Sequence, residues 1–393
     1  MSWPRAVRMA LVTALLAGLC VAGSSRVAAP HQAVQAALDR QAAAVLHGDR
    51  SAYLAEVDPR ASGYRERQRR VVDNLHRLPL ARFSYRVRAV DAGRGRAEAQ
   101  LRYRLRGPAT ATVTAEERYR VVRRGTDWYL AGELPDSARQ LWDEGRLRVV
   151  SGRHSVVLGS DRRLSELRSL ARVADRAVPA VSRVWPERWR DRVVVEVPRS
   201  TRQLARMLGQ PAGGYTGIAA VTAGSTGAGE RPGGDRVLVN PEAFPLLSRR
   251  GQQLVMTHET THVATRERTG PTTPMWLSEG FADWVGYRGT GVEPRQAAPE
   301  LTEAVHGRTV PERLPGGADF RFGADANRMA RAYEGSWLAC RMVARQWGEA
   351  RLVELYQRVG RGESADRALR RVLDVDQARF TQRWRDYLRE ELG

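Results

Sequence analysis

The sequence predicts an α+β protein of two domains, a small one with helices and an antiparallel sheet, then a larger one with a short mixed sheet and a mainly helical C-terminal half. Three observations support this. The 393 residues are enough for two hydrophobic cores. Within the first 135 residues the apolar spacing changes from a helical period to a period of 2. From Gly251 onward the pattern is helical almost to the end.

The first domain is predicted at residues 30–135. Helices are expected at 32–46, 51–56 and 64–78. Strands are expected at 83–89, 97–105, 111–122 and 128–131, the last two separated by a turn at 124–127. Helices followed by an antiparallel meander resemble the cone-shaped nuclear transport factor 2-like fold. That fold hosts both enzymes and inert modules, so the resemblance implies only an accessory domain.

The second domain is predicted at residues 145–393. Strands are expected at 147–158, 193–197, 218–221 and 237–239, with a helix at 165–184. Residues 222–235 are rich in Gly, Ser and Thr and are expected to form a flexible loop. This loop lacks the Gly-Lys-Ser/Thr ending of a phosphate-binding loop.

Residues 1–29 are predicted to be a signal peptide or a signal anchor. Arg5 and Arg8 precede an uncharged, mostly apolar run, Met9 to Gly23, that is shorter than the roughly 20 residues of a membrane span. The protein is therefore expected to be secreted or anchored at the outer face of the cytoplasmic membrane. Leu19 stands where a lipoprotein signal needs a small residue. Without the signal, Cys340 is the one remaining cysteine, and we expect it to be a buried apolar side chain.

The net charge of +20 comes entirely from arginine, because the sequence contains no lysine. The arginines are spread over nearly every segment. Nucleic-acid-binding proteins instead cluster their basic residues, so no specific nucleic acid is expected. Codon usage in a GC-rich genome explains the pattern, and an anionic envelope or membrane surface is the alternative partner.

A metal-binding motif, H-E-x-x-H, spans His258 to His262. On a helix, residues four apart stand one turn above each other, so both imidazoles project from one face and can bind one zinc ion. Glu259 is rotated by about 100° from His258. It therefore lies beside the metal, where it can accept a proton from water. The alternative is a surface helix with two solvated histidines.

A second helix is predicted after Pro274. It carries Glu279 among mostly apolar neighbours, where an unpaired carboxylate would be costly, and a metal explains its presence. Asp283 is one turn further on the same face. It is expected to orient a ligand histidine through the second ring nitrogen.

His258 to His262, a short loop, and then W-L-S-E-G-F-A at Trp276 to Ala282 resemble the gluzincin metallopeptidases, particularly bacterial peptidase MA-like domains. The second segment is also similar to that of the zinc aminopeptidases. The resemblance implies a zincin-like domain, a Zn²⁺ cofactor and Glu279 as the third ligand. The aminopeptidases carry a G-x-M-E-N strand whose Glu holds the substrate amine. The comparable stretch here, 216–221, has no acid, which favours an endopeptidase.

The resemblance further implies a tyrosine that donates to the oxyanion, and Tyr333 is the candidate. Its helical stripe with Trp337 and Trp347 is equally typical of core packing. His306 is the alternative donor.

The predicted function is an exported zinc peptidase in which Glu259 is the general base and the strand near Val237 pairs with a peptide or protein substrate. One alternative is an inactive zinc-fold binding protein at the cell envelope, although it would have no need of Glu259. The other is a basic surface binder whose affinity falls with salt. The sequence makes no prediction of oligomeric state.

Overall fold

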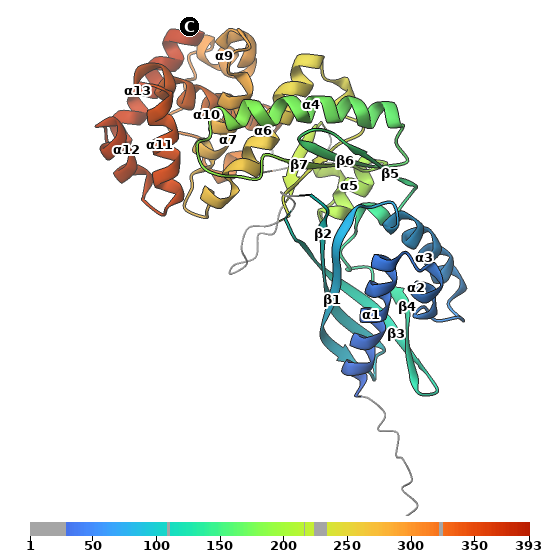
Figure 1. Cartoon of the computed structure of the whole chain (residues 1–393). Coiled ribbons are helices and arrows are strands. Elements are labelled where there is room, and N and C mark those ends of the chain that lie inside the picture. The colour runs from blue at the N-terminus through green and yellow to red at the C-terminus, as the bar shows by residue number, and fades with distance from the viewer. Residues whose placement is uncertain (1–28, 108–110, 216, 224–233, 322–324) are drawn as a thin grey trace, which may run out of the picture.

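A computed structural model describes residues 29–107, 111–215, 217–223, 234–321 and 325–393. The chain is elongated, with the first domain at one end, a second sheet in the middle and a group of helices at the other end (Figure 1). This arrangement confirms the predicted α+β class. The predicted signal lies almost entirely outside the described residues. Within the described ranges, no helix is long and apolar enough to cross a membrane.

The first domain has three helices followed by a four-stranded antiparallel meander of order β1-β2-β3-β4. Its elements are α1 (Pro30–His47), α2 (Arg50–Ala55), α3 (Ser62–Leu75), β1 (Leu80–Asp91), β2 (Arg96–Leu105), β3 (Val113–Arg124) and β4 (Asp127–Glu133). Helix α1 packs on the sheet through Val34 and Leu38. Helix α3 ends earlier than predicted, because the residue before Pro79 is disfavoured in helical conformation.

The second sheet has five strands in the order β5-β6-β7-β9-β8. Its elements and neighbouring helices are β5 (Leu147–Ser151), β6 (Ser155–Ser160), α4 (Leu164–Ser182), β7 (Val193–Val197), α5 (Thr201–Met207), β8 (Ala220–Ala223) and β9 (Arg236–Val239). Strands β6, β7 and β9 are parallel, while the two edge strands β5 and β8 are antiparallel to their neighbours. Helix α4 lies across this sheet (Figure 1).

The single strand predicted at 147–158 was wrong, because the segment forms the hairpin β5–β6. The Asp175 carboxylate, on α4, accepts hydrogen bonds from the backbone N–H groups of Arg153 and His154. A side chain at Gly152 would collide with that carboxylate. The turn is therefore stabilised by a helix that is distant in the sequence.

The remainder of the chain is mainly helical, as predicted. The helices are α6 (Arg249–Thr265), α7 (Met275–Tyr287), α8 (Pro294–Ala297), α9 (Pro299–His306), α10 (Ala326–Gln346), α11 (Glu349–Gly360), α12 (Ala365–Leu373) and α13 (Gln377–Leu392). Five short 3-10 turns complete the described elements: η1 (Leu141–Asp143), η2 (Ala212–Tyr215), η3 (Phe244–Leu246), η4 (Arg266–Arg268) and η5 (Gly317–Phe320). Cys340 is fully buried in the helical core and is a free thiol, as expected.

The two predicted domains meet at a packed junction. Trp142, in η1, is 4% exposed and its ring contacts Phe83 and Tyr103 of the first sheet, with ring centroids 6.4 and 4.8 Å apart. The Asn74 side chain donates to the Trp142 carbonyl at 2.9 Å and accepts from the N–H of Leu147 at 2.9 Å. One hydrophobic cluster includes residues of both sheets. Residues 30–135 and residues 145–393 therefore share a hydrophobic core where they meet.

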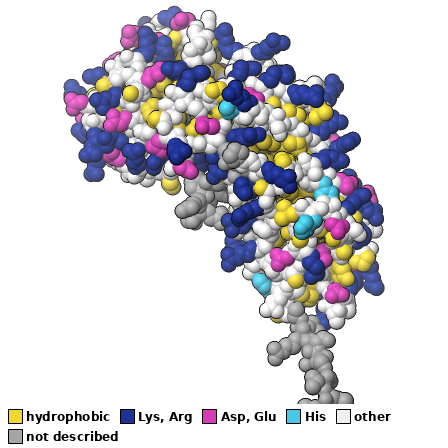
Figure 2. Space-filling view, in the orientation of Figure 1, with side chains coloured by type: hydrophobic (Ala, Val, Ile, Leu, Met, Phe, Trp, Pro, Cys, Tyr) yellow, Lys and Arg dark blue, Asp and Glu magenta, His cyan; other side chains and the backbone are white. Residues whose placement is uncertain are grey.

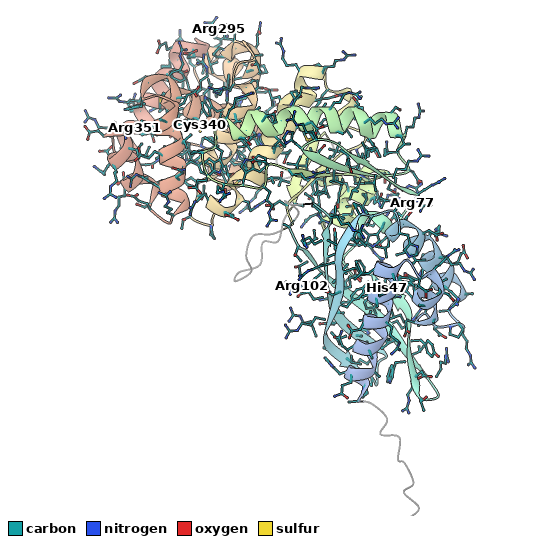
Figure 3. The ribbon with its side chains drawn as sticks, viewed as in Figure 1. His47, Arg77, Arg102, Arg295, Cys340 and Arg351 are labelled. Atoms are coloured by element: carbon teal, nitrogen blue, oxygen red, sulfur yellow. The ribbon has the colours of Figure 1, made fainter. Side chains whose placement is uncertain are left out.

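Arginine side chains are scattered over the face of the molecule in Figure 2. Arg77, Arg102, Arg295 and Arg351 are exposed and project from four separate parts of the chain (Figure 3).

Candidate metal centre

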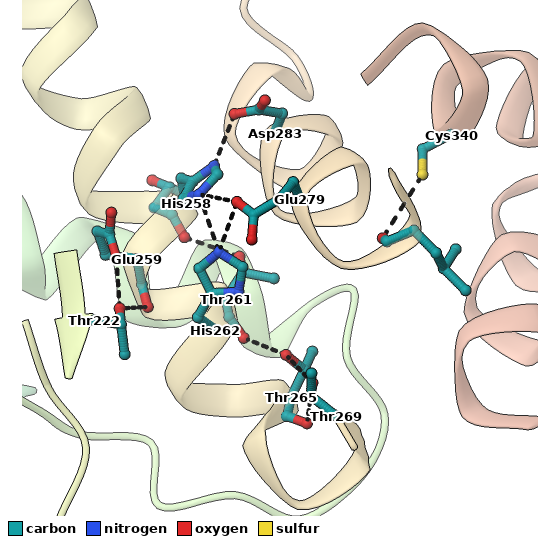
Figure 4. A network of polar contacts seen from close by, with 12 residues as sticks. Thr222, His258, Glu259, Thr261, His262, Thr265, Thr269, Glu279, Asp283 and Cys340 are labelled. Atoms are coloured by element: carbon teal, nitrogen blue, oxygen red, sulfur yellow. Dashed lines mark hydrogen bonds and ion pairs between the residues drawn. The ribbon is translucent and has the colours of Figure 1, made fainter. Parts of the chain in front are cut away.

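Helix α6 places His258 and His262 one turn apart on one face. The Ser248 hydroxyl, which accepts from the N–H of Gly251 at 3.1 Å, caps the start of the helix. The two Nε2 atoms lie 3.0 Å apart. Both rings therefore converge on one point, as the H-E-x-x-H spacing predicts (Figure 4).

Helix α7 brings Glu279 to the same point. Its Oε2 atom lies 3.3 Å from the Nε2 atoms of both His258 and His262. The next residue, Gly280, faces the carbonyl of Ser336 on α10, and a side chain there would collide with it. The glycine thus allows α7 to pack closely against α10 and fixes the position of Glu279.

Asp283 lies one turn beyond Glu279 on α7. Its Oδ1 atom is 2.7 Å from Nδ1 of His258 (Figure 4). A hydrogen bond from Nδ1–H to this carboxylate leaves the Nε2 lone pair directed at the cluster.

The electrostatics of the site follow from two histidines and three carboxylates packed close together. Burial works against charge on His258, but Asp283, Glu279 and Glu259 outweigh it and raise the pKa of His258 well above its usual range. Burial also favours protonation of Glu279, but His262 and His258 outweigh it and lower the pKa of that carboxyl. Both shifts therefore result from the close approach of imidazoles and carboxylates in this cluster.

The donor atoms fit zinc. His258, His262 and Glu279 form the metal-ligand group found among the described residues. Zinc takes nitrogen and oxygen ligands at about 2.0–2.1 Å in a tetrahedron, whose edges are then about 3.3 Å long. The observed separations of 3.0, 3.3 and 3.3 Å match those edges. Three protein ligands leave a fourth position open, which is typical of catalytic zinc sites.

Glu259 lies beside the cluster and is 7% exposed. The Thr222 hydroxyl donates to its Oε2 atom at 2.5 Å (Figure 4). Sequence reasoning missed Thr222, because it lies in a segment that was predicted to be a loop. The strand expected at 218–221 is instead β8, which continues to Ala223 and includes Thr222. No local signal marks this threonine, since its partner is 37 residues away.

A cavity of about 590 Å³ opens over the cluster. Its lining includes residues of β8, α6, α7 and α10, among them Tyr333. The ring centroid of Tyr333 is 6.3 Å from that of His258. Burial, together with nearby Glu279, raises the pKa of Tyr333 well above its usual range. His306 is exposed at the end of α9 and is not among the residues lining the cavity.

The prediction that the strand near Val237 pairs with the substrate was wrong. Val237, on β9, has β7 on one side and β8 on the other, so neighbouring strands flank it on both sides. Strand β8 is the edge strand beside β9, and its residues Ala220, Val221 and Thr222 line the cavity.

No family model matches the sequence, and no curated protein does. Among solved structures, the chain is similar to native yeast LTA4 hydrolase, with 13% identity, a TM-score of 0.36, and coverage of 69% of this chain and 42% of that one. A variant of a two-domain M1 zinc metallopeptidase bound to L-arginine has 12% identity, a TM-score of 0.35, and coverage of 79% and 65%. A variant of an M1 zinc metallopeptidase from Deinococcus radiodurans has 11% identity, a TM-score of 0.34, and coverage of 76% and 62%.

This chain thus spans less than two thirds of the length of each of these three structures. The similarities are weak, and any function for this chain depends on its own residues.

Proposed function

We propose that this protein is a zinc-dependent peptidase that cleaves internal peptide bonds. The observation that supports this proposal is the tetrahedral spacing of His258, His262 and Glu279 at a cavity, with Glu259 buried beside them. A purely structural zinc site is closed by four protein ligands and needs no base. The intact Glu259 and the cavity therefore favour an enzyme over an inactive binding protein.

In the proposed mechanism, His258, His262 and Glu279 hold the metal, and Asp283 fixes the orientation of His258. Bound zinc would polarise the substrate carbonyl and lower the pKa of a water molecule to about 7. Glu259 accepts a proton from that water and then passes it to the leaving amine.

Tyr333 is the proposed donor to the oxyanion. Burial and the nearby carboxylates hold the pKa of its hydroxyl well above the usual range, so it stays protonated and able to donate at neutral pH. Its ring is held edge to face against Phe320, with centroids 5.1 Å apart.

An internal cleavage site is proposed because no acid is left to bind a free amine. The acids among the described cavity-lining residues are Glu259, Glu279 and Asp283. Glu279 is a proposed ligand, Asp283 contacts His258, and Glu259 is the proposed base. The described part of the stretch comparable to G-x-M-E-N carries no acid. The edge strand β8 offers its backbone to an extended peptide that continues in both directions past the metal.

The decisive test is Glu259→Gln, assayed against a library of peptides with blocked N-termini. The amide cannot accept the proton, so the rate should fall by about 100- to 10,000-fold while zinc content stays unchanged. Equal rates at matched zinc occupancy would exclude Glu259 as the base. A wild type inactive on the whole library would favour the binding protein, and a preference for free amino-acid amides would favour an aminopeptidase.

We also propose that the protein is exported and either secreted or anchored at the outer face of the cytoplasmic membrane. Arg5, Arg8 and the apolar run that follows support this. A cleaved signal predicts a mature N-terminus between about residues 23 and 31, which N-terminal sequencing measures. Cytoplasmic accumulation of the full chain would contradict export.

A further inference from the structure

Within the described residues, the Glu259 carboxylate accepts one hydrogen bond, from the Thr222 hydroxyl on β8. The Thr222 hydroxyl lies 2.5 Å from Oε2 of Glu259 and 3.1 Å from its carbonyl oxygen. A hydroxyl carries a single proton. The shorter contact with the charged carboxylate takes that proton, because charge-assisted hydrogen bonds are stronger than neutral ones.

The terminal torsion of a glutamate is broad, so a carboxylate without a partner samples many orientations. A hydrogen bond to one oxygen removes this freedom and leaves the other oxygen, Oε1, to receive a proton. We propose that Thr222 is a positioning residue that holds the Glu259 carboxylate in its working orientation. This inference rests on the proposed function, in which Glu259 is the general base.

The same contact links the base to the strand beside which the substrate is proposed to lie. Strand β8 is paired to β9, with Thr222 opposite Val237, and its other edge is free in the described sheet. The hydroxyl of Thr222 therefore fixes Glu259 relative to the backbone that would align the peptide. Displacements of about 1 Å in such an arrangement are costly to the rate.

Thr222→Val tests the inference with little change of shape, because valine keeps the β-branch and suits a strand. Loss of one hydrogen bond to a charged group predicts a fall in kcat of roughly 10- to 100-fold, with KM changed by less than about threefold. Thr222→Ser restores the hydroxyl and should recover most of kcat. Thr302→Val is the matched control, since the Thr302 hydroxyl bonds the carbonyl of Ala298 within α9, outside the cavity.

A double-mutant cycle separates positioning from a structural role. If Thr222 acts through Glu259, adding Thr222→Val to Glu259→Gln should lower the residual rate by less than about twofold. If Thr222→Val lowers the rate as much in the Glu259→Gln variant as it does in the wild type, the inference is overturned. A wild-type kcat in Thr222→Val, together with an inactive Glu259→Gln, would also overturn the inference. A fully active Glu259→Gln would instead overturn the proposed function.

Crystal structures of the metal-free wild type and Thr222→Val give a readout that does not depend on activity. The wild type should show one conformer of the Glu259 carboxylate, and Thr222→Val should show several. A single unchanged conformer in the variant would mean that other contacts position Glu259.

Discussion

Asp283 illustrates how a residue outside the metal-ligand group controls the proposed metal centre. His258 has two ring nitrogens, and only Nε2 points at the cluster. The contact between Nδ1 and Asp283 selects the tautomer with a free Nε2 lone pair. Both residues are buried, at 9% exposure each, so water competes weakly for this hydrogen bond. Removing the charge of Asp283 should therefore weaken metal binding without removing a ligand.

We predict that Asp283→Asn lowers zinc affinity by roughly 10- to 100-fold. Chelator competition with the purified protein measures this affinity. His258→Ala removes a proposed ligand and should lose nearly all the zinc, so it shows the largest loss of zinc affinity expected at this site. Asp136→Asn, at an exposed position just after the first domain, is the control and should bind as the wild type does. Wild-type affinity in Asp283→Asn would argue against the orienting role.

At the scale of elements, the contact between α7 and α10 determines where Glu279 lies. The two helices approach closely at Gly280, next to the proposed ligand. A methyl group at this position would meet the Cys340 sulfur and the Ser336 carbonyl oxygen, and the carbonyl cannot move without displacing α10. The packing of these two helices thus sets the position of the proposed metal ligand.

Gly280→Ala should lower the free energy of unfolding by about 3 kcal/mol or more, because the added carbon overpacks against backbone. It should also reduce zinc binding, since Glu279 moves with α7. Denaturant melts and metal analysis measure the two effects. Gly63→Ala is the matched control. Gly63 is in helix α3 with open space around it, so alanine there should stabilise by about 0.4–1 kcal/mol. Equal free energies of unfolding for Gly280→Ala and Gly63→Ala would contradict the close approach of α7 to α10.

At the scale of the whole molecule, the packed junction around Trp142 makes the two domains interdependent. Its ring lies between the first sheet and the second, and the same cluster contains Leu101 and Val156. A further polar link joins Arg236 of β9 to the Tyr103 hydroxyl of β2 at 3.0 Å. Arg236 also contacts the buried carboxylate of Glu196 at 3.5 Å. The first domain therefore supports the sheet that carries β8.

Trp142→Ala should lower the free energy of unfolding by about 3–5 kcal/mol, the usual cost of deleting a buried tryptophan side chain. Because the core is shared, zinc release and loss of secondary structure should occur at one temperature, below that of the wild type. Leu246→Ala is the control, since Leu246 is 84% exposed and should be nearly neutral. Two separate transitions in Trp142→Ala would show instead that the domains unfold independently.

The sequence alone determined the features that depend on local periodicity. The period-2 strands of the first domain, the turn at Gly125 and the helical C-terminal half follow from spacing and turn residues. The helical period also places His258 and His262 on one face of α6, and Glu279 and Asp283 on one face of α7.

Only the tertiary structure decided the features that depend on distant partners. Asp175 of α4 stabilises the turn at Gly152. The edge strand at the cavity is β8, not the strand that contains Val237. The hydroxyl of Thr222 contacts the carboxylate of Glu259. Strand order and side-chain contacts between elements depend on long-range pairing, for which a single sequence carries no local pattern. The helical period determines which residues share a face of a helix, whereas tertiary packing determines which other elements that face contacts.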